Sequence, residues 1–331
     1  MTPKQLQAWV KANITAENAE IELYWRWARH MCRTNMWFLS YEVLAYRDLD
    51  HEFHGRMCDR LQRWPMRDDL TPYPYQADAW PRGGFKTTLA TVARSIQIIL
   101  CCQEETFLIQ HGEKDQAKAI LSEIKGHLAE NELLKWLFPD VLFQNPKNDS
   151  ETWTREQATV RRSGIYKEAT FEVASADSDS TGGHYTVLIF DDLVTAKNVS
   201  TPEQIEKVHR HFRITSGGPF QDQRWIKPGD ARWKDHYRQH QFWNDEKQEL
   251  QIPHRTALIF TRWDANDSNS RVIDPKNASF QGKVDVCIER AWNPDTSHPE
   301  GGWSFFPKKF PKWKLQDIAG FLGPSSFSAQ Y

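Results

Sequence analysis

The chain has 331 residues, more than one hydrophobic core usually holds, so we expect a large core with an appended subdomain or a second domain. Its composition, 39% hydrophobic and 13% aromatic, excludes a disordered chain, and its formal net charge of −2 excludes a protein that binds nucleic acid through a global positive field. The sequence has no apolar run near the roughly 20 residues of a membrane span, no N-terminal signal segment and no cysteine pair typical of a zinc ribbon. We therefore expect a soluble, intracellular protein that makes only local contacts with any DNA.

The first part of the chain, residues 1–69, has helical patterns. Thr15 is a suitable cap for a helix that runs through residues 24–31. A second helix is predicted for residues 49–64, because its apolar side chains recur at helical spacing, at Phe53, Met57, Leu61 and Trp64. We interpret this part as a helical, lid-like subdomain.

From about residue 70 to residue 275, strand and helix patterns alternate. Helices are predicted for residues 89–100, 114–128 and 201–213. Buried strands are predicted for residues 106–110, 185–190 and 256–261, and shorter alternating runs occupy residues 158–162 and 169–174. Continuous apolar strands that alternate with helices are typical of a mainly parallel sheet covered on both faces, so the predicted fold class is α/β.

Two later segments combine aromatic and basic residues. The insertion at residues 216–250 is irregular in pattern, and its basic residues are balanced by acidic ones. Such a segment fits a surface for nucleic acid or a partner, or a structural lid or flap, and the second interpretation is preferred. In the C-terminal part, residues 276–331, the run 306–315 (FPKKFPKWKL) resembles a DNA contact, but a structural turn before a helix is again the preferred interpretation.

Residues 81–88, with the sequence PRGGFKTT, come directly before a predicted helix. A loop that binds nucleotide phosphates needs glycines that free its backbone N–H groups, a lysine, a hydroxyl for Mg²⁺ and a helix N-terminus, and this segment has all four. The match to Gly-x4-Gly-Lys-[Ser/Thr] is incomplete, because Trp80 and Phe85 occupy the two glycine positions before Lys86. Alone, the segment also fits a glycine turn followed by a helix with an exposed lysine.

Polar side chains follow two of the predicted buried strands. Asp191 and Asp192 end the strand 185–190, and two adjacent carboxylates at such a place are unfavourable without a cation. In P-loop ATPases the first such carboxylate holds Mg²⁺ and the second polarises the attacking water. Thr261 and Arg262 end the strand 256–261, and strand ends of open α/β sheets meet at one edge, where ligands bind. A surface ion pair of Arg262 is the competing interpretation.

The order and the amino-acid sequences of these motifs resemble those of the ATPase domain of the large terminase subunit of tailed bacteriophages. The resemblance extends from about residue 40 to residue 331 and is carried by PRGGFKTTL at 81–89, LIFDDLVT at 188–195 with Asn198 after it, FTRWDANDS at 260–268, and the segments FPKKF and FSAQY near the end. It implies an additional-strand P-loop ATPase fold that hydrolyses ATP with Mg²⁺. The family pattern continues past a Gln-Tyr pair into a nuclease domain, whereas this chain stops at Gln330-Tyr331, so no nuclease activity is expected in it.

The resemblance also implies the partners and the roles of the residues. The expected partners are double-stranded DNA, a portal protein, a small terminase subunit and further copies of the chain in a ring, a pentamer by family resemblance, in the host cytoplasm and away from any membrane. The expected catalytic residues are Asp192, Arg82 and Lys86, and Thr87 with Asp191 is expected to hold Mg²⁺. The nucleotide phosphates are expected to contact Arg82, Gly83, Gly84, Phe85, Lys86, Thr87 and Thr88.

Thr261 and Arg262 are expected to couple hydrolysis to movement. The alternatives are a helicase-like or other nucleic-acid-remodelling ATPase, and a nucleotide-binding module without catalysis, which Phe85 in a glycine position suggests.

Overall fold

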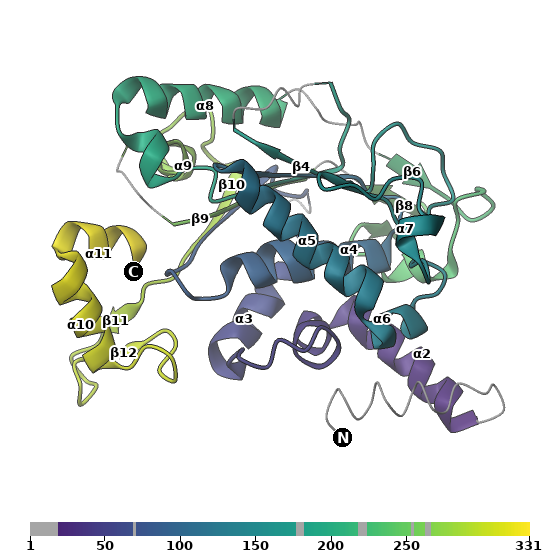
Figure 1. The fold of residues 1–331 in the computed structure, drawn as a ribbon, viewed down its shortest axis with the longest axis horizontal. Helices are drawn as coiled ribbons and strands as arrows, with labels where there is room; N and C mark the ends of the chain where they lie inside the picture. The colour runs from purple at the N-terminus through teal and green to yellow at the C-terminus, as the bar shows by residue number, and fades with distance from the viewer. Residues whose placement is uncertain (1–18, 69–70, 177–181, 218–223, 253–254, 262–265) are drawn as a thin grey trace.

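The computed structural model describes residues 19–68, 71–176, 182–217, 224–252, 255–261 and 266–331 (Figure 1). Thr15 and Arg262, which the sequence singled out, lie outside these ranges. The centre of the molecule is a seven-stranded sheet whose strands, in spatial order, are β10 (Val284–Ile288), β1 (Tyr75–Ala79), β9 (Arg255–Phe260), β5 (Val187–Asp191), β2 (Phe107–His111), β4 (Phe171–Ser175) and β3 (Gln157–Ala158). Every pairing is parallel except that between β3 and β4. The predicted α/β class with a mainly parallel sheet is confirmed.

The central strands are buried on both faces, which explains their continuous apolar sequences. All residues of β5 and β9 are buried. Alternate residues of β5 contribute to two separate cores: Val187 and Ile189 to one, and Leu188 and Phe190 to the other. The sheet is thus the middle layer of three.

Helices cover the two faces of the sheet (Figure 1). On one face lie α4 (Arg94–Cys101), α5 (Lys114–Glu130) and α6 (Glu132–Leu137), and on the other lie α8 (Pro202–Gly217) and α9 (Ser268–Ile273). The short helix α7 (Pro146–Asp149) follows α6. Residues 87–93 form a π-helix, η2 (Thr87–Ala93), which continues into α4. The predicted helix 89–100 therefore begins two residues earlier, and its first part is wider than an α-helix.

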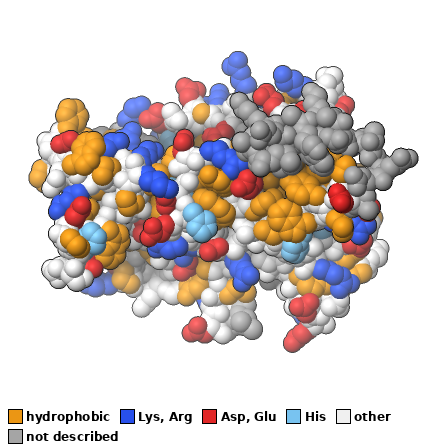
Figure 2. Space-filling view, turned by 90° about the horizontal axis from the view of Figure 1, so that it is seen from below, with side chains coloured by type: hydrophobic (Ala, Val, Ile, Leu, Met, Phe, Trp, Pro, Cys, Tyr) orange, Lys and Arg blue, Asp and Glu red, His pale blue; other side chains and the backbone are white. Residues whose placement is uncertain are grey.

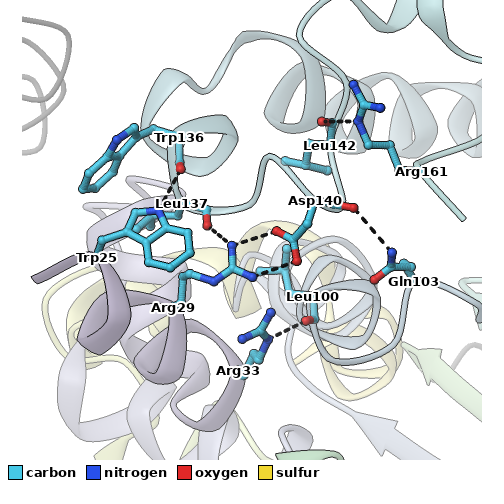
Figure 3. Close-up of polar contacts among 10 residues, drawn as sticks. All are labelled: Trp25, Arg29, Arg33, Leu100, Gln103, Trp136, Leu137, Asp140, Leu142 and Arg161. Atoms are coloured by element: carbon cyan, nitrogen blue, oxygen red, sulfur yellow. Dashed lines mark hydrogen bonds and ion pairs between the residues drawn. The ribbon is translucent and has the colours of Figure 1, made fainter. Parts of the chain in front are cut away.

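The N-terminal helices pack on the same face as α4 and α5. They are α2 (Ala19–Thr34), the π-helix η1 (Phe38–Val43) and α3 (His51–Leu61), whose first N–H groups are capped by Asp50. Arg29 of α2 donates two hydrogen bonds to the carboxylate of Asp140, at 2.7 and 2.8 Å, and Arg33 donates to the carbonyl oxygen of Leu100 at 2.7 Å (Figure 3). These bonds fix α2 to the end of α4 and to the loop after α6.

The sequence predictions differ from the structure at one alternating run and at β1 and β10, for which no strand was predicted. The run 158–162 is not a strand beyond Ala158, because the N–H of Thr159 bonds to Thr152 and that of Arg161 to Val141, both in loops. No strand was predicted for β1, because its polar residues Gln76 and Asp78 interrupt the apolar pattern. Both are nevertheless fully buried.

The insertion is more regular than its sequence pattern. It contains β6 (Arg224–Ile226), a 3₁₀ helix η4 (Asp235–Gln239), β7 (Trp243–Asn244) and β8 (Glu249–Ile252), and the three strands form an antiparallel sheet in the order β6-β8-β7. The rings of Trp233 and Trp243 pack at 5.5 Å, and the guanidinium of Arg238 lies over both. Trp233, Tyr237 and Trp243 of the insertion thus pack on one another, whereas Trp225 is exposed.

The C-terminal part returns to the sheet edge that carries the loop after β1. After β10 it contains the hairpin β11 (Trp292–Pro294) and β12 (Gly302–Ser304), then α10 (Lys312–Leu322) and α11 (Pro324–Gln330). Phe305, Phe306 and Phe310 are at most 5% exposed, so the aromatic residues of FPKKF face the interior. This packing supports the structural interpretation of that run.

The surface carries both signs of charge. On the face seen from below, acidic and basic side chains are interspersed among patches of exposed hydrophobic side chains (Figure 2). Across the described ranges, no helix combines the length and the apolar character that a membrane crossing would require.

Candidate functional site

Three segments far apart in the sequence meet at the carboxyl ends of β1, β9 and β5. The loop that contains Lys86 follows β1, the two aspartates end β5, and Thr261 follows β9, which lies between the other two strands. Lys86 Nζ lies 2.8 Å from Asp192 Oδ1 and also donates to Thr261 Oγ1, across 106 and 175 residues of sequence. The convergence expected from the motifs is therefore present.

The loop adopts conformations that explain its glycines and its phenylalanine. Gly83 has φ +78°, and a Cβ there would lie 2.9 Å from the ring of Phe310. Phe85 has φ +57°, the left-handed conformation that a glycine would adopt easily in the same position. For a residue with a side chain this conformation costs about 1 kcal/mol or more. The Phe85 ring packs against His54, with centroids 5.5 Å apart, which offsets part of that cost.

Asp191 is held by two hydroxyl groups of η2. Thr87 Oγ1 donates to Asp191 Oδ1 at 3.1 Å, and Thr91 Oγ1 donates to Oδ2 at 2.6 Å. Asp191 is fully buried, and this burial together with the charge of Asp192 raises its pKa to about 7.

The donor set at Asp191 fits Mg²⁺. A hydroxyl and a carboxylate side by side are the hard oxygen ligands that this ion prefers. A buried carboxylate whose ionised form is disfavoured by its surroundings gains most from a nearby cation. Thr87 and Asp191 are thus suitable ligands, and Thr91, which the sequence reasoning did not single out, orients the carboxylate.

Asp192 is partly exposed and belongs to a different environment. Its Oδ1 accepts hydrogen bonds from Lys86 Nζ and, at 3.0 Å, from the N–H of Thr261. Its backbone has φ +44°, and its N–H donates a hydrogen bond to the carbonyl oxygen of Ile259 at 2.7 Å.

The backbone after β5 also packs closely against Gly112. A Cβ at position 112 would lie 2.7 Å from the carbonyl oxygen of Leu193, so this position needs a glycine.

The remaining predicted residues surround these groups. Arg82 is exposed, and its guanidinium donates to Gln330 Oε1 at 3.1 Å, so in this structure it contacts the C-terminal helix. Gly84 is close-packed, since a Cβ there would lie 3.0 Å from the carbonyl oxygen of Pro81. Thr88 lines the cavity described next. The expectation for Arg262 cannot be placed, because that residue lies outside the described ranges.

A cavity of about 600 Å³ opens beside Lys86. Among the described residues, the charged side chains of its wall are four cations and two carboxylates: Arg82, Lys86, Lys197, Lys309, Glu113 and Asp192. An excess of positive charge in a concave site suits a polyphosphate. The volume is within the range of ordinary small-molecule sites.

Sequence reasoning missed several residues of this wall. His111, the last residue of β2, and Glu113, two residues later, line the cavity, so the same strand-end rule that found Asp192 would have found them. His111 Nδ1 accepts a hydrogen bond from the N–H of Glu113 at 2.9 Å, and burial lowers the pKa of His111 below its usual value. Lys309 lies in the run 306–315 that the sequence had singled out, but no pattern placed it at this cavity, because only the tertiary fold brings it to the loop.

Comparison with models of known protein families and with curated proteins gives no match to this chain. The features of the site that indicate a function are the lysine loop, the paired aspartates and Thr261, which bonds to Lys86 and to Asp192.

Proposed function

We propose that this chain is a Mg²⁺-dependent P-loop ATPase. The observation that carries the proposal is the meeting of Lys86, Asp192 and Thr261 at one sheet edge, beside a cavity with excess positive charge. The sheet order supports the additional-strand type, because β9 stands between the strand of the lysine loop and the strand of the aspartates.

The loop supplies the phosphate-binding groups. Its backbone N–H groups and the N-terminus of η2 donate hydrogen bonds to the phosphate oxygens, and the Lys86 ammonium binds the terminal phosphates. In the structure, Lys86 is bonded to Asp192 and Thr261. An arriving triphosphate competes for the ammonium, so that nucleotide binding releases the Asp192 carboxylate.

Asp192 then orients the water that attacks the terminal phosphorus. Its carboxylate, held in place by the N–H of Thr261, accepts a hydrogen bond from that water. Thr87 and Asp191 would hold Mg²⁺, which when bound would supply positive charge against the phosphate oxygens. Arg82 would leave Gln330 to balance the charge that develops in the transition state.

Thr261 contacts both partners of this exchange. Its hydroxyl accepts from Lys86 and its N–H donates to Asp192, so the end of β9 changes its hydrogen bonds when Lys86 moves to the phosphates. With Arg262 next in sequence, this strand end is a suitable place to couple hydrolysis to movement of the chain.

The work proposed for this ATPase is translocation of double-stranded DNA by a phage terminase large subunit. The support is the resemblance of the ordered motifs, together with the strand order and the lysine–aspartate convergence. The proposed partners are a portal protein, a small terminase subunit and further copies in a ring in the host cytoplasm. Contacts with DNA phosphates alone would suit packaging that is independent of sequence.

The test is ATP turnover with and without Mg²⁺, double-stranded DNA and portal protein. Lys86→Ala should abolish turnover, and Asp192→Asn should halt hydrolysis while ATP still binds. Lys308→Ala is the matched control, because Lys308 is exposed and its side chain pairs with Asp50 outside the cavity. Turnover of either site variant within a few-fold of wild type would refute the role assigned to it. Strand separation would favour a helicase-like enzyme, and bound but uncleaved ATP a binding module.

A further inference from the structure

Lys309 reaches the lysine loop from a position 226 residues away in the sequence. Its Nζ donates a hydrogen bond to the carbonyl oxygen of Gly83 at 2.9 Å and lies 4.3 Å from the centre of the Phe85 ring. The same side chain lines the cavity beside Lys86. Two lysines from opposite ends of the fold therefore face one cavity.

The backbone that carries Lys309 is fixed against the loop. Phe305 and Phe310 are buried, and their rings occupy the space that side chains at Gly84 and Gly83 would need, at 3.1 and 2.9 Å from the Cβ positions. Because the segment 305–310 is held in this way, Lys309 is positioned by packing, unlike an ordinary surface lysine. Its neighbour Lys308 is directed elsewhere and pairs with Asp50 at 2.9 Å.

Among the described residues, Lys309 forms no ion pair with a carboxylate, and Asp48 interacts with it only electrostatically. Within the described parts of the chain, the ion pairs of the cavity join Lys86 to Asp192 and Lys197 to Glu113, and none joins Lys309 to an acid. An ammonium group has three N–H donors, and the bond to Gly83 uses one of them. A cation in this state is suited to bind an anion that enters the cavity.

We propose that Lys309 is a second phosphate-binding lysine, which contacts a terminal phosphate of a bound nucleoside di- or triphosphate. This inference rests on the proposed function, since it concerns the same nucleotide. A phosphate held by both lysines links the N-terminal loop to the segment 305–310, so that nucleotide binding also tightens the C-terminal part onto the sheet edge.

The experiment compares nucleotide binding by Lys309→Met, Lys309→Arg and Lys308→Met. Methionine keeps an apolar stem over Phe85 and removes the charge, and arginine keeps the charge. Calorimetry with ATP, ADP and AMP in the presence of Mg²⁺ should show ATP bound about tenfold to hundredfold more weakly by Lys309→Met, which is the loss expected for one charge-assisted hydrogen bond. ADP should lose less affinity, AMP little, and Lys309→Arg should bind ATP within about threefold of wild type. Lys308→Met should match wild type.

Three outcomes would overturn the inference. Wild-type affinity for ATP in Lys309→Met would show that the ammonium contacts no phosphate. An equal loss for ATP, ADP and AMP, accompanied by a lower unfolding temperature, would show that Lys309 only supports the loop. Absence of ATP binding by the wild type would overturn both this inference and the proposed function, whereas binding that depends on Lys86 but not on Lys309 would overturn this inference alone.

Discussion

Replacement of Asp191 by asparagine should stabilise the nucleotide-free protein above neutral pH. Burial and the adjacent Asp192 raise the pKa of Asp191 from 3.8 to about 7, so its ionised form is held at a cost in free energy. That cost is about 4 kcal/mol at most, since each pKa unit corresponds to about 1.36 kcal/mol. Asparagine has nearly the same shape and no charge, but it accepts the hydroxyl bonds of Thr87 and Thr91 less well, which costs about 1 kcal/mol. The expected net gain is about 1–3 kcal/mol.

The gain should depend on pH in a defined direction. Below about pH 4 the carboxyl group is protonated in both the folded and the unfolded chain, and it contributes nothing. Between about pH 4 and 7 the unfolded chain has released this proton while the folded protein still holds it, so wild-type stability falls as the pH rises through this window. Urea unfolding without nucleotide or Mg²⁺, at pH 4.5 and pH 8, should therefore show a gain for Asp191→Asn at pH 8 and little or none at pH 4.5.

The control for this experiment is Asp192→Asn. Asp192→Asn removes the attraction to Lys86 but also the repulsion that raises the pKa of Asp191, so these two effects oppose one another and the free energy of unfolding at pH 8 should change by less than about 1 kcal/mol. The reasoning would be refuted if Asp191→Asn changed stability equally at both pH values, or if it destabilised the protein at pH 8.

Three further predictions follow from other contacts. Phe85→Gly should be more stable than Phe85→Ala by about 1 kcal/mol in urea unfolding, because both lose the ring and only glycine adopts φ +57° without strain; a more stable alanine variant would contradict this. Gly112→Ala should reduce ATP turnover at least tenfold, because a Cβ there would lie 2.6 Å from Thr195 Cγ2 and displace the loop after β5; unchanged steady-state turnover would show that this loop tolerates the shift. Arg29→Ala should lower the free energy of unfolding by about 2–4 kcal/mol, since it removes a two-bond ion pair with Asp140 that is largely buried on the arginine side. Arg26→Ala, which loses only an exposed pair with Glu22, should change it by less than about 0.5 kcal/mol, and equal effects of the two variants would contradict the distinction.

The sequence predicts those parts of the fold whose local pattern and burial agree. The predicted strands 185–190 and 256–261 each contain an apolar run, and the structure buries β5 and β9 on both faces, so these strands were recognisable. Strand β1 was missed because Asp78 is buried only with the help of Arg60, which donates to it at 2.6 Å from another element. A strand that contains one member of a buried ion pair cannot be recognised from its local sequence pattern, because the partner lies elsewhere in the sequence.

The residues of the candidate site also fall into those that short motifs predict and those that only the tertiary fold brings together. Lys86 and Asp192 belong to short motifs with a chemical meaning, and strand ends of one sheet edge must converge, so their meeting was predictable. Thr91 was missed because its role depends on the wider turn of the π-helix η2, which the sequence pattern does not distinguish from an α-helix. Lys309 was missed because a contact across 226 residues depends on the whole fold.

The continuous helix formed by η2 and α4 connects two distant parts of the molecule. It begins at the lysine loop and ends where Gln97, Leu100 and Cys101 bond to α2, roughly 20 Å away. Because this helix is continuous and is hydrogen-bonded to α2 at its far end, a shift of the loop by a fraction of an ångström would also move α2. The exposed side chains of Leu23 and Trp27 on α2 would then move when the lysine loop moves.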